Sequence, residues 1–184
     1  MNEVRLHGRG GQGTVMAVRM LVSAVVREGK YAASFPMFGS ERRGAPVAAF
    51  LRIDEKPIRE RTQIYQPNCL IVVDPRLIKS YAQDIFSGLK PGGILVINAS
   101  LMAKELYSPN VGMVGFVDAT RIGLEEIGTP VTNTCMMGAF ARTTGWVQLD
   151  SILESLSDNF SGALLDKNIR CAKRGAEETT LIKL

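Results

Sequence analysis

The sequence predicts a single-domain α/β sandwich, in which a mostly parallel, Rossmann-like sheet carries an antiparallel addition and a helical C-terminal segment. Strand-like and helix-like segments alternate through the first two thirds of the chain, which is typical of α/β proteins. Residues 69–73 and 94–98 are continuous apolar runs, as expected for strands buried on both faces of a parallel sheet. Because 184 residues suit one hydrophobic core, we expect one domain over residues 1–184.

The N-terminal part opens with a strand, a glycine-rich turn and a helix. Residues 3–7 alternate between apolar and polar, and residues 13–28 carry valines and leucines at helical spacing. Residues 31–38 are aromatic and extended, and residues 47–53 are typical of a strand. We expect residues 56–61 to pair with that strand as the antiparallel addition.

The central part predicts a second strand–helix–strand unit. Residues 76–89 have the length and pattern of a crossover helix between the two apolar runs. Residues 113–118 then predict a strand, and residues 119–127 a short helix.

The last third of the chain predicts helices only, over residues 133–144, 149–156 and 166–182. Asp150 and Asp166 precede apolar periodic runs, so we expect both as helix N-caps.

Charge and hydropathy exclude several classes of function. The net charge is +4, but the basic residues are scattered and form no basic stripe, so we expect no nucleic-acid partner. The longest apolar candidate, residues 92–99, is far too short to span a bilayer, and the N-terminus has no leader-like pattern. We therefore expect a cytoplasmic protein with no membrane partner.

The three cysteines, Cys69, Cys135 and Cys171, are far apart and lie in apolar or helical surroundings. No C-x-x-C spacing exists, which argues against a zinc or iron–sulfur site built by this chain alone. We expect buried free thiols in a reducing compartment.

The glycine-rich turn at residues 8–13 is the most informative motif. Gly8, Gly10 and Gly13 match G-x-G-x-x-G between a strand and a helix, the context of a dinucleotide site. Such a site needs an acidic residue about 20 positions further on, and residues 31–38 contain none. The P-loop pattern is also absent. What remains is either an amide nest for a phosphate or carboxylate, or simply a tight turn.

A second motif, Phe38 to Gly44, places Glu41, Arg42 and Arg43 between glycines. Two guanidiniums next to a glycine nest match a polyanion, because arginine binds phosphate or carboxylate bidentately. The alternatives are a solvated loop or an Arg–Glu pair at a subunit contact.

Three further polar residues lie where a ligand could reach them. His7 abuts the glycine turn and is an acid, a base or only a hydrogen-bond donor. Asp74 and Asn98 end two predicted parallel strands, at the edge where α/β sheets bind ligands, although capping or turn formation explains both equally well.

Read together, HGRGGQG at 7–13 and YAASFPMFGSERRGAPV at 31–47 resemble the gamma subunit of 2-oxoacid:ferredoxin oxidoreductases, of the pyruvate or 2-ketoisovalerate synthase type. The likeness covers almost the whole chain. It continues at residues 52–53, 56–59, 63–67, 73–75, 130–134 and 137–140.

The resemblance implies one subunit of an enzyme that oxidises a 2-oxoacid, such as pyruvate, to CO₂ and acyl-coenzyme A and passes the electrons to ferredoxin. Thiamine diphosphate, Mg²⁺ and the 4Fe–4S clusters would belong to partner subunits, named alpha, beta and delta in this family. The isolated chain would then be inactive and would tend to self-associate through apolar surface left exposed.

The resemblance also suggests a ligand for the two glycine-bounded segments, namely the phosphates of coenzyme A. In this hypothesis the glycine turn offers backbone amides and the Gln12 side chain, and the arginines neutralise the phosphates. The cofactor-binding residues are Gly8, Arg9, Gly10, Gly11, Gln12, Gly13, Glu41, Arg42 and Arg43. The alternatives are a purely structural interaction subunit and a free-standing dinucleotide-binding protein. The sequence predicts no catalytic or metal-ligating residue on this chain.

Overall fold

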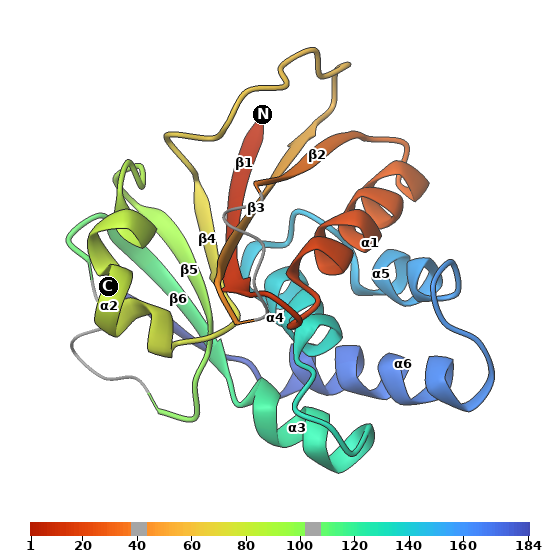
Figure 1. Cartoon of the computed structure of the whole chain (residues 1–184). Helices are drawn as coiled ribbons and strands as arrows, with labels where there is room; N and C mark the ends of the chain where they lie inside the picture. Colours follow the sequence, from red (N-terminus) through yellow and green to blue (C-terminus); the bar gives the residue numbers. More distant parts are fainter. Residues whose placement is uncertain (38–43, 102–107) are drawn as a thin grey trace.

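The computed structural model describes residues 1–37, 44–101 and 108–184, and its strands form one sheet of seven (Figure 1). The order across the sheet is β2-β3-β1-β4-β5-β6-β7. The strands are β1 (Asn2–Arg9), β2 (Tyr31–Met37), β3 (Pro46–Asp54), β4 (Cys69–Val72), β5 (Gly93–Asn98), β6 (Val111–Val117) and β7 (Thr180–Lys183). The helices are α1 (Thr14–Arg27), α2 (Arg76–Phe86), α3 (Ala119–Glu126), α4 (Asn133–Thr144), α5 (Leu149–Leu156) and α6 (Gly162–Glu177).

The predicted parallel core is confirmed. Strands β1, β4, β5 and β6 are neighbours and run parallel, whereas β2, β3 and β7 add antiparallel pairs at the two edges. The antiparallel addition is therefore correct in kind but was assigned to the wrong residues. Residues 56–61 form no strand, because β1 and β2 already occupy both edges of β3.

The two faces of the sheet are covered unequally. Helices α1, α4, α5 and α6 cover one face and bury the larger core, and α2 lies on the opposite face (Figure 1). The alternation within β1 follows from this, since Val4 and Leu6 point into the larger core while Arg5 and His7 face the other side. Among the described residues, no helix has the length and apolar character needed to cross a membrane.

The C-terminal segment departs from the all-helical prediction. Helix α6 begins at Gly162 after the N-cap Ser161 and ends at Glu177, and Thr180–Lys183 pair with β6 as a strand. The predicted N-caps are also wrong, because Gln148 is the N-cap of α5, and Asp150 and Asp166 lie inside their helices.

The position of the site follows from the way the chain leaves the parallel strands. After β1 the chain enters α1 on one face, and after β4 it enters α2 on the other face (Figure 1). Adjacent parallel strands whose connections leave in opposite directions open a crevice at their carboxyl ends, where α/β proteins bind ligands. Here the crevice lies between the glycine turn and the start of α2.

Candidate functional site

The glycine turn between β1 and α1 depends on glycine for conformation and for space. Gly11 and Gly13 have φ values of 93° and 73°, in the left-handed region. A Cβ on Gly13 would lie 2.5 Å from Nδ2 of Asn133, the first residue of α4. The turn therefore brings the start of α1 against the start of α4.

Several groups that the sequence assigned to a ligand are hydrogen-bonded inside the chain. The amide of Gly10 donates to the Ala45 carbonyl at 2.9 Å, and the amide of Gln12 donates to the Arg9 carbonyl at 3.1 Å. The amide of Arg9 donates to Oε1 of Gln12 at 2.7 Å. Within the described residues, the amides of Gly11 and Gly13 and those of Thr14, Val15 and Met16 at the start of α1 bond to no acceptor.

Asp74, directly after β4, joins the turn to α2. Its carboxylate accepts hydrogen bonds from Nε of Arg9 at 3.1 Å and from Nε2 of Gln12 at 3.1 Å. The Arg76 guanidinium donates to the same carboxylate at 2.9 and 2.7 Å, and the Arg76 amide donates at 3.0 Å. One buried carboxylate thus holds two guanidiniums.

This cluster carries an excess of positive charge. Hydrogen bonds from Arg76 and Gln12 lower the pKa of Asp74 to about 2, so the carboxylate is ionised at neutral pH. It offsets only one of the two guanidinium charges, and the Arg76 side chain is 73% exposed. The start of α1 adds the positive end of a helix dipole. The arrangement favours an anionic ligand.

The second sequence motif ends at Gly44, where the described residues resume. Gly44 donates its amide to the Gly10 carbonyl at 3.2 Å, and its own carbonyl accepts from the Arg9 guanidinium at 3.1 Å. Residues Glu41, Arg42 and Arg43 lie outside the described residues. Their role in the site stays a prediction, but the residue that follows them is held against the glycine turn.

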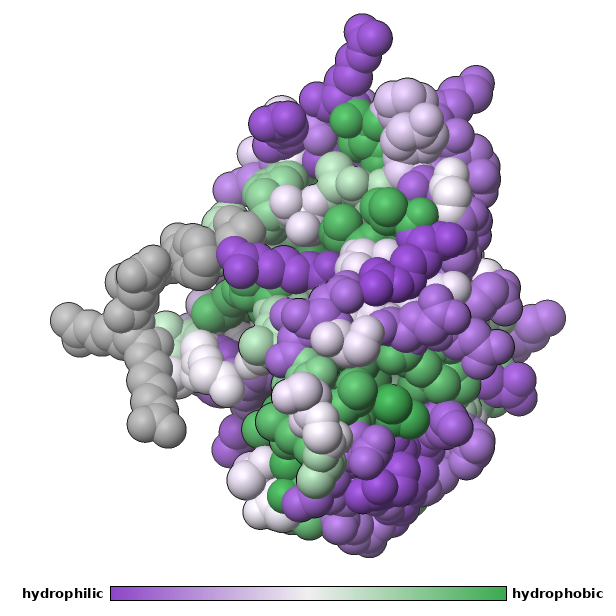
Figure 2. Space-filling model, turned by 90° about the vertical axis from the view of Figure 1, so that its right-hand side faces the viewer, coloured by the Kyte–Doolittle hydropathy of each residue, from purple (hydrophilic) through white to green (hydrophobic). Residues whose placement is uncertain are grey.

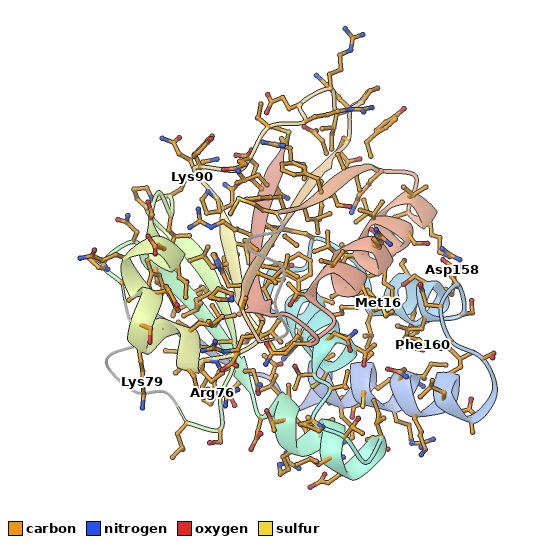
Figure 3. All side chains as sticks on the ribbon, in the orientation of Figure 1. Met16, Arg76, Lys79, Lys90, Asp158 and Phe160 are labelled. Atoms are coloured by element: carbon orange, nitrogen blue, oxygen red, sulfur yellow. The ribbon has the colours of Figure 1, made fainter. Side chains whose placement is uncertain are left out.

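An open cleft of about 1010 Å³ lies beside the cluster, at the carboxyl ends of β5 and β6. Arg76 and Lys79 line one wall from α2, and Figure 3 shows both at the lower side of that helix. Asn98, Asp118 and Thr120 line the opposite side. This is the edge at which parallel strands present ligand-binding groups.

The strand-end asparagine that the sequence singled out has a structural role. Asn98 donates to the Val73 carbonyl at 3.0 Å and to Oγ1 of Thr120 at 2.9 Å, so it joins β5 to the start of α3. The neighbouring Asp118 is the N-cap of α3 and accepts from the Arg121 amide at 3.0 Å.

His7 is not suited to proton transfer at neutral pH. Its Nε2 accepts a hydrogen bond from Nε of Arg5 at 3.0 Å, so the ring proton of the neutral imidazole lies on Nδ1. Burial, reinforced by the Arg5 charge, lowers the pKa of His7 to about 3. The ring therefore stays neutral and serves as a fixed hydrogen-bond donor through Nδ1.

Sequence reasoning missed Arg76 and Lys79 and did not connect Asp74 with Arg9. The signal was available in part, since Asp74-Pro75-Arg76 follows a buried strand at the edge where the glycine turn also ends. Adjacent parallel strands β1 and β4 make these two strand ends neighbours, and this pairing is not visible in the sequence alone.

The cysteines are free and buried, as predicted. Burial raises the pKa of all three thiols, that of Cys171 to about 11, so they are protonated and unreactive at neutral pH. Within the described residues, no three His, Cys, Asp or Glu side chains come together as a metal site.

Comparison with known proteins gives a consistent family. Residues 3–178 match the family model described as pyruvate ferredoxin/flavodoxin oxidoreductase. The chain is 48% identical to the pyruvate/ketoisovalerate oxidoreductases common subunit gamma of Thermococcus kodakarensis, over 100% of both chains. It is 52% identical to the NADH-dependent phenylglyoxylate dehydrogenase subunit gamma of Aromatoleum evansii, over 98% of this chain and 95% of the relative.

A solved structure has the same fold. The crystal structure of pyruvate oxidoreductase subunit PORC from Thermotoga maritima superposes with a TM-score of 0.85 at 36% identity. The match covers 99% of this chain and 98% of that subunit, so the likeness extends over the whole described fold.

Proposed function

We propose that this chain, which belongs to the pyruvate ferredoxin/flavodoxin oxidoreductase family and is the gamma subunit of a 2-oxoacid:ferredoxin oxidoreductase complex, binds coenzyme A at the carboxyl edge of its sheet. The observation that carries the proposal is the Arg9–Asp74–Arg76 cluster, which has excess positive charge and lies between the start of α1 and a large cleft. Coenzyme A carries a diphosphate and a 3′-phosphate, and these phosphates match guanidiniums and unpaired amides.

The ligand groups differ in part from those that the sequence suggested. The amides of Gly11, Gly13 and the first three residues of α1 have no acceptor among the described residues and are available for a phosphate. Arg76 and Lys79 extend the basic surface along the cleft. Arg42 and Arg43 remain part of the proposal, because they immediately precede Gly44 in the chain.

The redox chemistry belongs to other subunits in this proposal. The described residues gather no three metal-ligating side chains, and the three cysteines are buried, so neither an iron–sulfur cluster nor a magnesium site fits them. We place thiamine diphosphate, Mg²⁺ and the 4Fe–4S clusters on alpha, beta and delta subunits, with ferredoxin reaching the complex through them. This chain holds the acyl acceptor and packs against the catalytic subunits.

The choice of 2-oxoacid also belongs to the partners. One relative is a common subunit of pyruvate and ketoisovalerate enzymes, and another serves a phenylglyoxylate enzyme. Both are about equally similar to this chain, at 48% and 52% identity. A subunit that is common to pyruvate and ketoisovalerate enzymes does not select between these two acids.

Isothermal titration of the assembled complex with coenzyme A tests the proposal. We expect Arg76→Ala/Lys79→Ala and Arg42→Ala/Arg43→Ala each to weaken binding about 10-fold or more, because each removes charge-assisted bonds to phosphate. Lys90→Ala is the control, since it removes one positive charge at the other end of β4 and β5 (Figure 3). Unchanged affinity in both double variants would overturn the coenzyme A assignment.

One observation favours a second function, that of a purely structural interaction subunit. Arg9 and Gln12 are hydrogen-bonded to Asp74 and to each other, and Arg9 also to Gly44. These bonds stiffen this edge of the sheet without any ligand. In that case the same double variants would leave coenzyme A binding intact and weaken the assembly of the complex, which size-exclusion chromatography measures.

A further inference from the structure

Helix α2 separates the large cleft from a second one, whose lining includes His7, the residue directly before the glycine turn. Ile78 and Lys79 line the large cleft, whereas Leu77, Tyr81 and Ile85 line the second. The second cleft has a volume of about 440 Å³ and lies over the face of β1 and β3 that is opposite α1. This volume is within the range of small-molecule sites.

The walls of the second cleft are aromatic and unusually exposed. Tyr65, Tyr81 and Met37 line it and are 71%, 40% and 40% exposed, and Phe50 lies on its β3 side. Tyr81 has φ −135° and ψ 26°, non-helical values that kink α2 at this residue. Aromatic side chains that surround a hollow are suited to stacking on a planar ring.

The polar groups of the cleft complement one kind of ring. His7 presents its Nδ1 proton, which no acceptor among the described residues takes, and Asp84 brings a carboxylate to the same cleft. Adenine offers ring nitrogens that accept a hydrogen bond next to an exocyclic amine that donates one. One donor and one acceptor therefore match an adenine edge, whereas a purely aliphatic ligand would leave both unpaired.

The cleft is continuous with the anion-binding edge. Pro46 and Val47 line it and are the register partners of Arg9 and Gly8 in the antiparallel pairing of β3 with β1. On the other side Leu77 lines the cleft and directly follows Arg76. A phosphate held at the glycine turn and Arg76 therefore has this cleft as its immediate neighbour.

We propose that the second cleft binds the adenine base of coenzyme A, stacked against Tyr65 and Tyr81 and read by His7 and Asp84. The inference rests on the proposed function, because it takes the phosphates to lie at the glycine turn. The diphosphate then spans the start of α2, and the pantetheine arm leaves through the large cleft. This path keeps the thiol away from the aromatic cleft and directs it toward a partner subunit.

Binding of three ligands to the assembled complex tests the proposal, namely coenzyme A, adenosine 3′,5′-bisphosphate and 4′-phosphopantetheine. We expect Tyr65→Ala/Tyr81→Ala to weaken the two adenine-containing ligands about 10-fold or more and to leave 4′-phosphopantetheine unchanged. Tyr65→Phe/Tyr81→Phe keeps the rings and should retain affinity. Tyr31→Ala is the control, since this tyrosine is 46% exposed on β2 and does not line the cleft.

The outcomes separate this inference from the proposed function. If the Tyr→Ala variant weakens 4′-phosphopantetheine as much as coenzyme A, the cleft holds the arm and not the base, and the inference is wrong. If it changes none of the ligands while Arg76→Ala/Lys79→Ala weakens coenzyme A, the inference is wrong and the proposed function stands. If the complex with native residues binds no coenzyme A, both are wrong.

Discussion

Asp74 is the residue on which the candidate site depends, because its single carboxylate orders Arg9, Gln12 and Arg76. Asp74→Asn removes the charge that offsets two guanidiniums, so we expect a loss of about 2 kcal/mol in the free energy of unfolding at pH 7. Urea unfolding measures it. Asp166→Asn, on the exposed side of α6, is the control and should change stability little.

The pH dependence of this effect has a defined sign. The pKa of Asp74 is lowered to about 2 in the folded chain, below the ordinary value of 3.8. Its contribution is therefore fully present above about pH 4 and is lost as the pH falls toward 2. The difference between the native chain and Asp74→Asn should shrink over this range. A difference that is constant from pH 6 to pH 3 would contradict the role assigned to Asp74.

His7 gives the chain a second pH dependence, of the same sign but nearer neutrality. It is the single histidine of the chain, and its pKa falls from 6.5 to about 3 on folding. Between these values the unfolded chain binds a proton that the folded chain does not. The free energy of unfolding therefore decreases as the pH falls. We expect a loss of about 2 kcal/mol from pH 7 to pH 5 in urea unfolding. His7→Gln, which can still accept from Arg5, should lack this loss; equal losses in both chains would refute the assignment.

The site could be predicted from the sequence only as far as its local parts. The glycine turn lies where G-x-G-x-x-G placed it, between β1 and α1, because strand alternation and helical spacing are local signals. The contact of Asp74 with Arg9 joins residues 65 positions apart and depends on the pairing of β4 with β1. The second cleft is lined by Tyr81, where α2 has a kink that no residue type signals.

At the scale of elements, the crossing of α4 and α6 is built on two glycines. A Cβ on Gly138 would lie 1.9 Å from the Ala172 carbonyl oxygen, and one on Gly175 would lie 2.1 Å from the Cys135 carbonyl oxygen. Both contacts are with backbone, which has no rotamer to change. We expect Gly138→Ala and Gly175→Ala each to destabilise the chain by about 1 to 3 kcal/mol, despite the better helix propensity of alanine.

Thermal unfolding of these variants, followed by circular dichroism, measures the effect. Lys173→Ala is the matched control, because it places alanine at an exposed position of the same helix. Its midpoint should stay close to that of the native chain. A stabilised Gly138→Ala variant would show that the two helices separate easily, contrary to the close approach of their backbones.

Elements whose partners are local were predicted, and elements that depend on distant partners were not. The spacing in residues 13–28 and the apolar runs at 69–73 and 94–98 identify α1, β4 and β5 almost residue by residue. Thr180–Lys183 continues the apolar pattern of α6 in sequence, yet it forms β7 because the edge of β6 is free to pair with it. Tertiary pairing decides such short segments more than local propensity does.

At the scale of the molecule, the edge proposed for coenzyme A and the side suited to contacts with other subunits are different parts of the surface. The proposed edge lies at the carboxyl ends of β1, β4, β5 and β6, and the two clefts lie on either side of α2. The helical side carries apolar surface instead, and Figure 2 shows hydrophobic patches between hydrophilic ridges there. The proposed function requires both, because in it the gamma subunit binds coenzyme A and remains in the complex.

The helical side leads to a prediction for the isolated chain. Met16 and Val26 of α1 and Leu164 of α6 are 41%, 55% and 47% exposed, which leaves apolar surface uncovered when partner subunits are absent. We expect the isolated chain to self-associate through this side. Met16→Ser/Leu164→Ser should shift it toward the monomer in sedimentation velocity experiments. Leu184→Ser makes the same kind of change at the C-terminus, where leucine is 57% exposed, and should leave the association intact. If both variants behave alike, association does not involve the helical side, and the contact with the catalytic subunits must be sought on another surface.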